Sequence, residues 1–181
     1  MNMDAIEAGK KVPEDINVVI EIPSRSNPIK YEIDKASGMV MVDRFIATSM
    51  HYPCDYGFIP HTLSEDGDPA DVLVISPYSL LPGVMIRCRP IGLLRMTDES
   101  GKDAKILAVP INKLTLLYQH IHKPEDLGTD LLATIEHFFK HYKDLEKDKW
   151  AKIDGWEGTE TAHKEILSSI NRYQQKKGVV A

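Results

Sequence analysis

The sequence predicts an α+β fold, in which a closed or partly closed β-barrel has helices packed outside it. Two observations favour this fold. Many short apolar segments fill the first two-thirds of the chain, and two amphipathic helical patterns follow in the last third. The chain has 181 residues and contains no internal repeat, low-complexity tract or long linker. One domain covering residues 1–181 is therefore expected.

Six segments are expected to form strands. Residues 16–23 are rich in β-branched side chains, are bounded by Pro13 and Pro23, and carry Glu21 as their only charge. Residues 29–34 alternate between apolar and charged side chains, and the turn 35–38 leads into residues 39–45, so a hairpin is expected. The other expected strands are 71–76, which is apolar on both faces, and 84–98 and 104–111, which flank the polar loop DESGKD.

Two helices are expected near the C-terminus. Residues 129–147 carry apolar side chains at a 3.6-residue spacing, and Thr129 is expected to be the N-cap. Residues 161–177 form a second, weaker amphipathic pattern.

Composition limits the classes of function. The net charge of −5 argues against a broad electrostatic surface for nucleic acid. Cys54 and Cys88 match neither a metal spacing nor a disulfide framework, and each is expected to be a small buried hydrophobic residue. The N-terminal segment lacks the apolar region of a secretory signal, and no stretch has the roughly 18 apolar residues of a membrane span. A soluble, cytoplasmic protein is expected.

The turn SEDGDPADVLVIS, residues 64–76, concentrates carboxylates beside an apolar strand. Gly67 and Pro69 interrupt regular structure, so the backbone can turn Asp66, Asp68 and Asp71 toward one point. Hard divalent cations bind such oxygen-rich clusters. An EF-hand is excluded, because its loop would need an oxygen ligand at 70, Gly at 71 and Glu at 77, where the chain has Ala, Asp and Pro.

A second acidic loop strengthens the metal hypothesis. Asp98, Glu99 and Asp103 lie at the ends of two expected strands, and strand ends of a small barrel gather at one mouth. Glu21 and Glu32, within strands, are further candidate ligands. Carboxylates this dense repel one another unless cations lie between them, so several metal ions are expected. Mg²⁺ suits such a site because it binds through few carboxylates and often bridges to phosphates.

Basic and phenolic side chains could hold a phosphate substrate. Any one of them is more typical of an ordinary surface or half-buried residue, and it is their combination with the carboxylates that favours a site. The tyrosines Tyr52 and Tyr56 are expected in an exposed loop. The other candidates are Lys30, Arg44, Lys105, Tyr142 and Lys143.

The motif DGDPADV, residues 66–72, closely resembles the signature of the family I soluble inorganic pyrophosphatases. Ala70 is a departure, since the family usually has a larger apolar residue there, but it removes no ligand. Other segments resemble the family in the same order, over almost the whole chain: VVIEIP, IKYEIDKASG, VDR, YPCDYGFIPHTL, LLPGVMIRCRPIG, MTDESGKDAK and HFFKHYKDLEKDKW.

The resemblance, to the short bacterial type, implies a five-stranded OB-like barrel with flanking helices, usually assembled as a homohexamer. It implies Mg²⁺-dependent hydrolysis of pyrophosphate to two orthophosphates, with several ions in each active site and no covalent intermediate. Asp68 would be the general base that takes a proton from a water bridging two ions, leaving a hydroxide to attack phosphorus. The implied metal ligands are Asp66, Asp71, Asp103, Asp98, Glu21 and Glu32. The implied phosphate-binding residues are Lys30, Arg44, Tyr56, Tyr142 and Lys143, with Tyr52, Glu99 and Lys105 in support.

Other functions remain to be weighed. His137 and His141 have the i, i+4 spacing of a metal pair, but no HExxH glutamate accompanies them, and a helix face that meets another subunit is favoured. An OB-fold oligonucleotide binder would need a basic groove with stacking aromatic residues, whereas this mouth would be acidic. A non-catalytic cation-binding protein would give Asp68 no distinct role.

Overall fold

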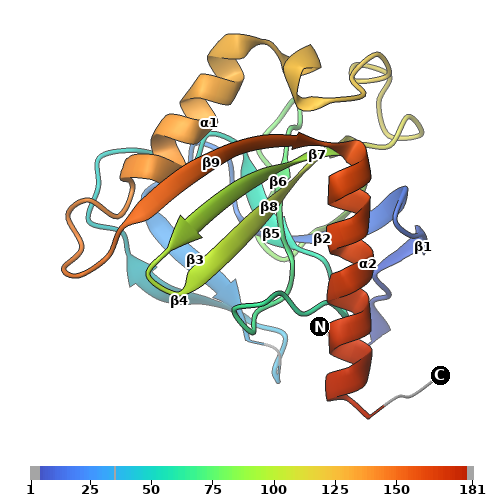
Figure 1. Ribbon diagram of the computed structural model, residues 1–181, viewed down its shortest axis with the longest axis horizontal. Coiled ribbons are helices and arrows are strands. Elements are labelled where there is room, and N and C mark those ends of the chain that lie inside the picture. Colours follow the sequence, from blue (N-terminus) through green and yellow to red (C-terminus); the bar gives the residue numbers. More distant parts are fainter. Residues whose placement is uncertain (1–4, 35, 179–181) are drawn as a thin grey trace.

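The computed structural model describes residues 5–34 and 36–178 and consists mainly of β-sheet with two α-helices (Figure 1). This confirms the predicted α+β class. None of the described helices is both long and apolar enough to cross a membrane. The strands are β1 (Gly9–Lys11), β2 (Asp15–Ile22), β3 (Ile29–Ile33), β4 (Val40–Phe45), β5 (Asp55–Phe58), β6 (Asp71–Val74), β7 (Met85–Asp98), β8 (Gly101–Pro110) and β9 (Ala151–Gly158). The helices are α1 (Thr129–His141), α2 (Thr159–Lys176) and the short 3₁₀ helix η2 (Pro124–Leu127).

Seven strands form one sheet in the order β1-β2-β5-β6-β8-β7-β9. Strand β2 also pairs with β7, so the pairings that run from β2 through β5, β6, β8 and β7 return to β2. The β6–β8 pair is parallel and sets Asp71 opposite Lys105. The sheet therefore brings together charged residues that are 34 positions apart in the chain.

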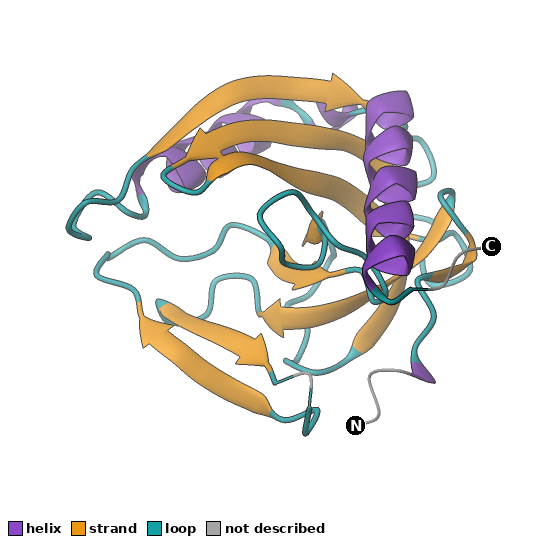
Figure 2. Ribbon diagram, turned by 60° about the horizontal axis from the view of Figure 1, so that its bottom comes forward, coloured by secondary structure: helices purple, strands orange, loops and turns teal. Residues whose placement is uncertain are grey.

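Strands β3 and β4 form a separate two-stranded sheet, as the sequence predicted. They pair antiparallel from Ile29–Phe45 to Ile33–Val40, and this register sets Lys30 opposite Arg44. In Figure 2 this hairpin lies at the lower left, apart from the long strands of the larger sheet. Lys35, in the expected turn 35–38, lies outside the described residues.

The helices cover the sheet with their apolar faces. Helix α1 lies beside β9 and buries Ile135, Phe138 and Phe139 in a cluster that includes residues of β7 and β8 (Figure 1). Helix α2 runs along one side of the sheet and buries Ala162 and Ile166 in a second cluster. The free cysteines Cys54 and Cys88 are both buried, as predicted.

Helix α1 differs from the prediction at both ends. It stops at His141 rather than at residue 147, and Leu145, an expected member of its apolar stripe, is 76% exposed. The chain turns after Tyr142 because Lys143 is directed to the acidic pair Asp98 and Glu99. The N-cap is Gly128, with φ +87°, and Thr129 is already the first helical residue.

Three strands and the start of a fourth escaped prediction. Strands β1, β5 and β9 are short or rich in glycine and charge, so they lack the apolar alternation that marks a strand. Strand β8 begins at Gly101, because Asp98 and Gly101 already pair across the turn. Most of the expected polar loop is therefore strand, and Asp103 lies within β8 rather than before it.

Gly57 allows β5 to lie close against β2. A Cβ atom at this position would lie 2.1 Å from the backbone oxygen of Val19. We expect Gly57→Ala to lower the free energy of unfolding by about 2–3 kcal/mol, because backbone must move to admit the methyl group. Denaturant unfolding measures this. Gly158→Ala is the control, since its Cβ would meet no atom within 4 Å, and an equal loss in both variants would contradict the explanation.

Candidate active site

A polar cavity of about 350 Å³ brings all the predicted site residues together. Its walls come from β2, β3, β4, the acidic turn before β6, the β7–β8 hairpin and the end of α1. All fifteen predicted residues line it: Glu21, Lys30, Glu32, Arg44, Tyr52, Tyr56, Asp66, Asp68, Asp71, Asp98, Glu99, Asp103, Lys105, Tyr142 and Lys143. Residues from segments far apart in the sequence thus form one surface, although their individual roles stay predictions.

The acidic turn has a defined backbone. Ser64 N donates to Asp68 O at 2.7 Å, and Gly67 adopts a positive φ of +97° that favours glycine. Asp66 Oδ1 accepts a hydrogen bond from Asp68 N at 3.1 Å. The turn therefore holds Asp66 and Asp68 at the cavity, while Asp71 is fixed at the first position of β6.

Lys105 lies between two of the aspartates. Its Nζ is 2.6 Å from Asp71 Oδ2 and 2.8 Å from Asp103 Oδ2, and the side chain is only 7% exposed. Burial lowers the pKa of Lys105, but attraction to Asp71, Tyr56 and Asp103 raises it by more, so the net pKa lies well above the usual value. The ammonium group stays charged and compensates these carboxylates.

Lys143 plays the same part at the β7–β8 hairpin. Its Nζ is 2.8 Å from Asp98 Oδ2 and 3.0 Å from Glu99 Oε1. Burial raises the pKa of Asp98, but the hydrogen bond from Lys143 and nearby positive charge lower it by more, so its net pKa is depressed. Asp98 is therefore ionised near neutral pH.

The third charged group joins β2 to the β3–β4 hairpin. Lys30 Nζ lies 2.5 Å from Glu32 Oε1 and 3.4 Å from Asp43 Oδ2. Glu21 accepts a hydrogen bond from Ile33 N at 2.9 Å. Burial raises the pKa of Glu21 to about 7; the hydrogen bond from Ile33 opposes this, and repulsion from Asp71 and Glu32 adds to it.

The raised pKa of Glu21 makes stability depend on pH. The folded chain holds this proton more tightly than the unfolded chain, whose carboxyl has a pKa near 4.5. The resulting stabilisation is complete below pH 4.5 and is lost as the pH rises through about 7. In chelator, we expect stability to fall between these values, and less steeply in Glu21→Gln. Urea unfolding at several pH values measures this, and parallel pH profiles would contradict it.

The two tyrosines of the YPCDY segment are buried, which corrects the prediction of an exposed loop. Tyr52 is 4% and Tyr56 is 8% exposed, because Tyr56 belongs to β5 and Tyr52 packs against Phe138 with ring centroids 4.6 Å apart. Burial raises the pKa of Tyr56 well above its usual value, so the hydroxyl stays protonated and can donate a hydrogen bond. Tyr142, at the end of α1, is likewise largely buried.

The described lining residues carry an excess of negative charge. They include eight carboxyl groups and five basic side chains. Burial, together with repulsion from Asp103 and Asp71, raises the pKa of Asp66 even though a hydrogen bond from Asp68 N opposes it. Such crowding of like charge is relieved when cations bind. The charge balance therefore fits a site that must recruit cations before an anionic substrate can enter.

The oxygen donors suit hard divalent cations. As they stand, no three His, Cys, Asp or Glu side chains among residues 5–34 and 36–178 are arranged to hold an ion. The lysine ammonium groups occupy the positions between the carboxylates instead. His137 and His141 do not line the cavity; their rings lie 4.7 Å apart, and His141 Nδ1 is 2.8 Å from Asp144.

Comparison with known proteins decides the family. A family model described as inorganic pyrophosphatase matches residues 18–174, most of the chain. The chain belongs to the inorganic pyrophosphatase family. It is similar to the curated inorganic pyrophosphatases of Salmonella typhimurium and Escherichia coli K12, with 59% identity to each over 97% of this chain and 100% of theirs. These relatives are inorganic diphosphatases, and they confirm the predicted bacterial family I type and enzyme class.

Solved pyrophosphatase structures share the fold. The inorganic pyrophosphatase of Coxiella burnetii is 51% identical, with a TM-score of 0.90 over 93% of this chain and 99% of that one. The enzyme of Thermus thermophilus is 43% identical, with a TM-score of 0.89 over 96% and 99% of the two chains. The family implies a divalent metal cofactor, in agreement with the excess of carboxylates in the cavity.

Sequence reasoning missed six residues of this pyrophosphatase-family cavity. Lys149, whose Nζ is 3.1 Å from Glu146, lies within the motif HFFKHYKDLEKDKW and could have been singled out as its last basic residue. The others carry no charge and gave no signal: Ile33, Phe58, Pro69, Ser100 and Phe139. Ala70, the departure from the family motif, is 1% exposed and packs in the second apolar cluster.

Proposed function

We propose that this chain hydrolyses inorganic pyrophosphate to two orthophosphates in the polar cavity, with Mg²⁺ as its cofactor. The observation that carries the proposal is the cavity itself, in which eight carboxyl groups and five basic side chains meet. Pyrophosphate is a small, highly charged anion, so the basic groups can contact it only if the carboxylates are neutralised. Family membership supports the reaction.

The carboxylates are the ligands of the proposed ions. Asp66, Asp71 and Asp103 would hold the first ion, and Asp98, Glu21 and Glu32 lie where they could hold others. When bound, Mg²⁺ supplies positive charge to the phosphoryl oxygens and acidifies water. Lys105, which contacts Asp71 and Asp103, would have to shift or share these carboxylates with the ion.

Asp68 is the proposed proton acceptor. Its backbone is held in the turn by Ser64 and Asp66, and its side chain is exposed at the cavity, where water can reach it. A carboxylate placed between two ligands of an ion lies within reach of a water molecule bound there. Removal of the proton lets the water oxygen attack one phosphorus directly, and the second phosphate departs without a covalent bond to the chain.

The phosphates would be held by basic and phenolic groups on several sides of the cavity. Lys30 and Arg44 lie opposite each other on the β3–β4 hairpin, and Lys143 lies at the end of α1. The protonated hydroxyls of Tyr56 and Tyr142 can donate hydrogen bonds. Tyr52, Glu99 and Lys105 support these groups through packing and ion pairs.

The remaining architecture belongs to the same proposal. The ring of pairings among β2, β5, β6, β8 and β7 supports a five-stranded OB-like barrel, and the chain as one domain. The exposed apolar residues Tyr78, Leu81, Leu116 and Leu117 support burial of surface between subunits, as a homohexamer requires. The two buried, unpaired cysteines are compatible with the reducing cytoplasm.

Phosphate release from pyrophosphate under different cations tests the function. With Mg²⁺ we expect rapid release, with chelator we expect release to stop, and with Ca²⁺ we expect binding but poor turnover because its coordination is looser. A phosphate monoester serves as the control substrate and should be cleaved far more slowly. Release that persists in chelator, or no release in Mg²⁺, would contradict the proposal.

A further inference from the structure

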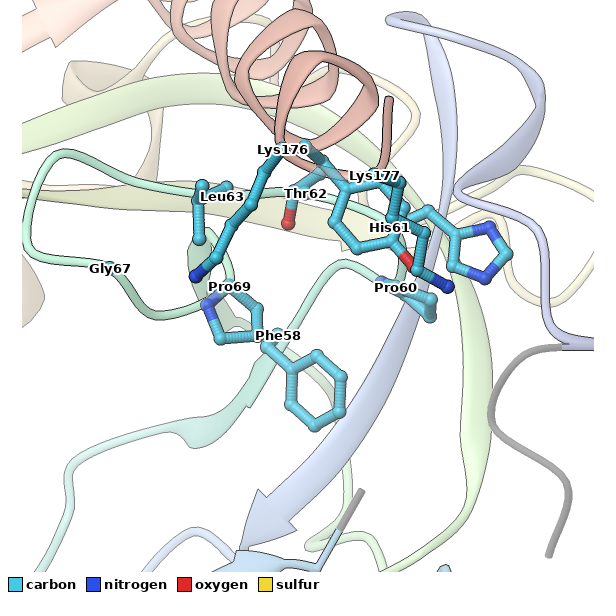
Figure 3. A pocket seen from close by; sticks show the side chains of 10 residues that line it. Phe58, Pro60, His61, Thr62, Leu63, Gly67, Pro69, Lys176 and Lys177 are labelled. Atoms are coloured by element: carbon cyan, nitrogen blue, oxygen red, sulfur yellow. The ribbon is translucent and has the colours of Figure 1, made fainter. Parts of the chain in front are cut away.

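A second pocket, of about 410 Å³, lies between the acidic turn and the C-terminal end of α2 (Figure 3). Its walls are mainly apolar and include Phe58, Pro60, Leu63 and Pro69 together with the ring of Tyr173. Its size falls in the range of sites that hold small organic molecules. None of the sequence motifs or proposed catalytic roles accounts for this pocket.

The pocket has the opposite electrostatic character to the polar cavity. None of the described residues that line it is acidic, whereas Lys176 and Lys177 both do so, although the chain as a whole carries a net charge of −5. Figure 3 shows Lys176 reaching from α2 toward Pro69. Lys177 Nζ lies 5.1 Å from the ring centroid of Tyr173. Positive charge therefore adjoins an apolar wall, a combination that suits an anion with an apolar body.

A flat aromatic surface adds to the recognition. The His61 ring stacks on Tyr173, with centroids 5.2 Å apart and planes 16° apart. His61 also has a positive φ of +56°, which is uncommon outside glycine and sets the direction of the chain as it enters the turn. The aromatic wall offers a flat ligand a stacking surface beside the lysines.

The pocket is joined to the turn that carries the proposed catalytic carboxylates. Leu63 N donates to Ser169 O at 2.9 Å, and Arg172 Nε donates to Leu63 O at 2.7 Å, so α2 holds the start of the turn. Phe58 and Pro69 line both this pocket and the polar cavity. A molecule in the pocket would therefore contact the back of the acidic turn.

We propose that this pocket binds a small organic anion, with a flat apolar body and one carboxylate, sulfonate or phosphate group, and that its binding restrains the acidic turn. The apolar body lies against Phe58, Pro69 and Tyr173, and the anionic group meets Lys176 and Lys177. This is an effector site, separate from the site of hydrolysis, and it does not depend on the proposed reaction.

The fluorescent aromatic sulfonate 1-anilinonaphthalene-8-sulfonate is a suitable probe. We expect saturable binding at one site per chain, weakened about fivefold or more by Lys176→Glu and by Tyr173→Ala. Lys164→Glu is the matched control, because it makes the same charge change at an exposed position of α2 that does not line the pocket, and it should leave affinity unchanged. Lys176→Glu alters an exposed side chain, so its result does not depend on core packing.

Two further measurements separate the other outcomes. Hydrogen exchange of residues 61–71 should slow when the probe binds the wild type, and should not change with the probe in Tyr173→Ala. Arg44→Gln, in the polar cavity, should leave probe affinity unchanged. Equal affinity in all variants, loss of affinity in Arg44→Gln, or unchanged exchange would overturn the proposal. So would a change of assembly size in Tyr173→Ala by light scattering, since the surface would then be a contact between subunits.

Discussion

Replacement of Asp68 by Asn is expected to lower phosphate release from pyrophosphate by about 10²–10⁴-fold, the range that a general base contributes. The amide keeps the shape of the side chain and the backbone bonds of the turn, which involve Ser64 O–H-independent groups: Ser64 N, Asp68 O and Asp68 N. It cannot accept a proton from water near neutral pH. The fall should therefore appear in kcat, with the affinity for divalent cation little changed, and steady-state kinetics measures it.

The matched control for this variant is Glu65→Gln. Glu65 lies in the same turn and is exposed, and it does not line the polar cavity. Its neutralisation makes the same change of charge and should alter kcat by no more than about twofold, since surface charges at this distance act weakly in solvent. Equal losses in the two variants would attribute the effect to the charge of the turn and would remove Asp68 as the base.

The second large effect is expected on stability. Lys105→Met should lower the free energy of unfolding in chelator by about 3–5 kcal/mol, because Asp71 and Asp103 would lose the buried cation between them. Added Mg²⁺ should restore much of this loss in the variant, since the ion would replace the ammonium group between the carboxylates. Thermal and denaturant unfolding, with and without the ion, measure both quantities.

Lys102→Met is the control for this experiment. Lys102 lies on the same strand, β8, but its side chain is exposed, so its replacement should change stability by less than about 1 kcal/mol. If Mg²⁺ stabilises the wild type, Lys102→Met and Lys105→Met by the same amount, the carboxylates around Lys105 are not where the ion binds.

Much of the site could be anticipated because its signals are local. Asp66, Asp68 and Asp71 stand within one turn whose Gly67 adopts a positive φ, and the β3–β4 hairpin that carries Lys30 and Arg44 has a plain alternating pattern. That these segments meet in one cavity was inferred only from the general geometry of barrel mouths and from the family resemblance. The parallel β6–β8 pair, which sets Asp71 opposite Lys105, leaves no mark in the local sequence.

The errors have physical causes in the tertiary structure. YPCDY contains residues typical of turns, yet Tyr52 and Tyr56 are buried because β5 lies between β2 and β6. The apolar period of α1 continues to Leu145, but the ion pairs of Lys143 draw the chain away after His141. The second pocket could not be found from sequence, because it depends on how the end of α2 meets the acidic turn.

A single-turnover experiment tests the central claim most directly. Excess enzyme is mixed with pyrophosphate and Mg²⁺, quenched at short times, and analysed for free phosphate and for the mass of the chain. We expect both phosphates to be released together, with no change in chain mass at any time and a rate at least about 10²-fold lower in Asp68→Asn. Failure to release phosphate, or a chain heavier by one phosphoryl group, would contradict direct attack by water in this cavity.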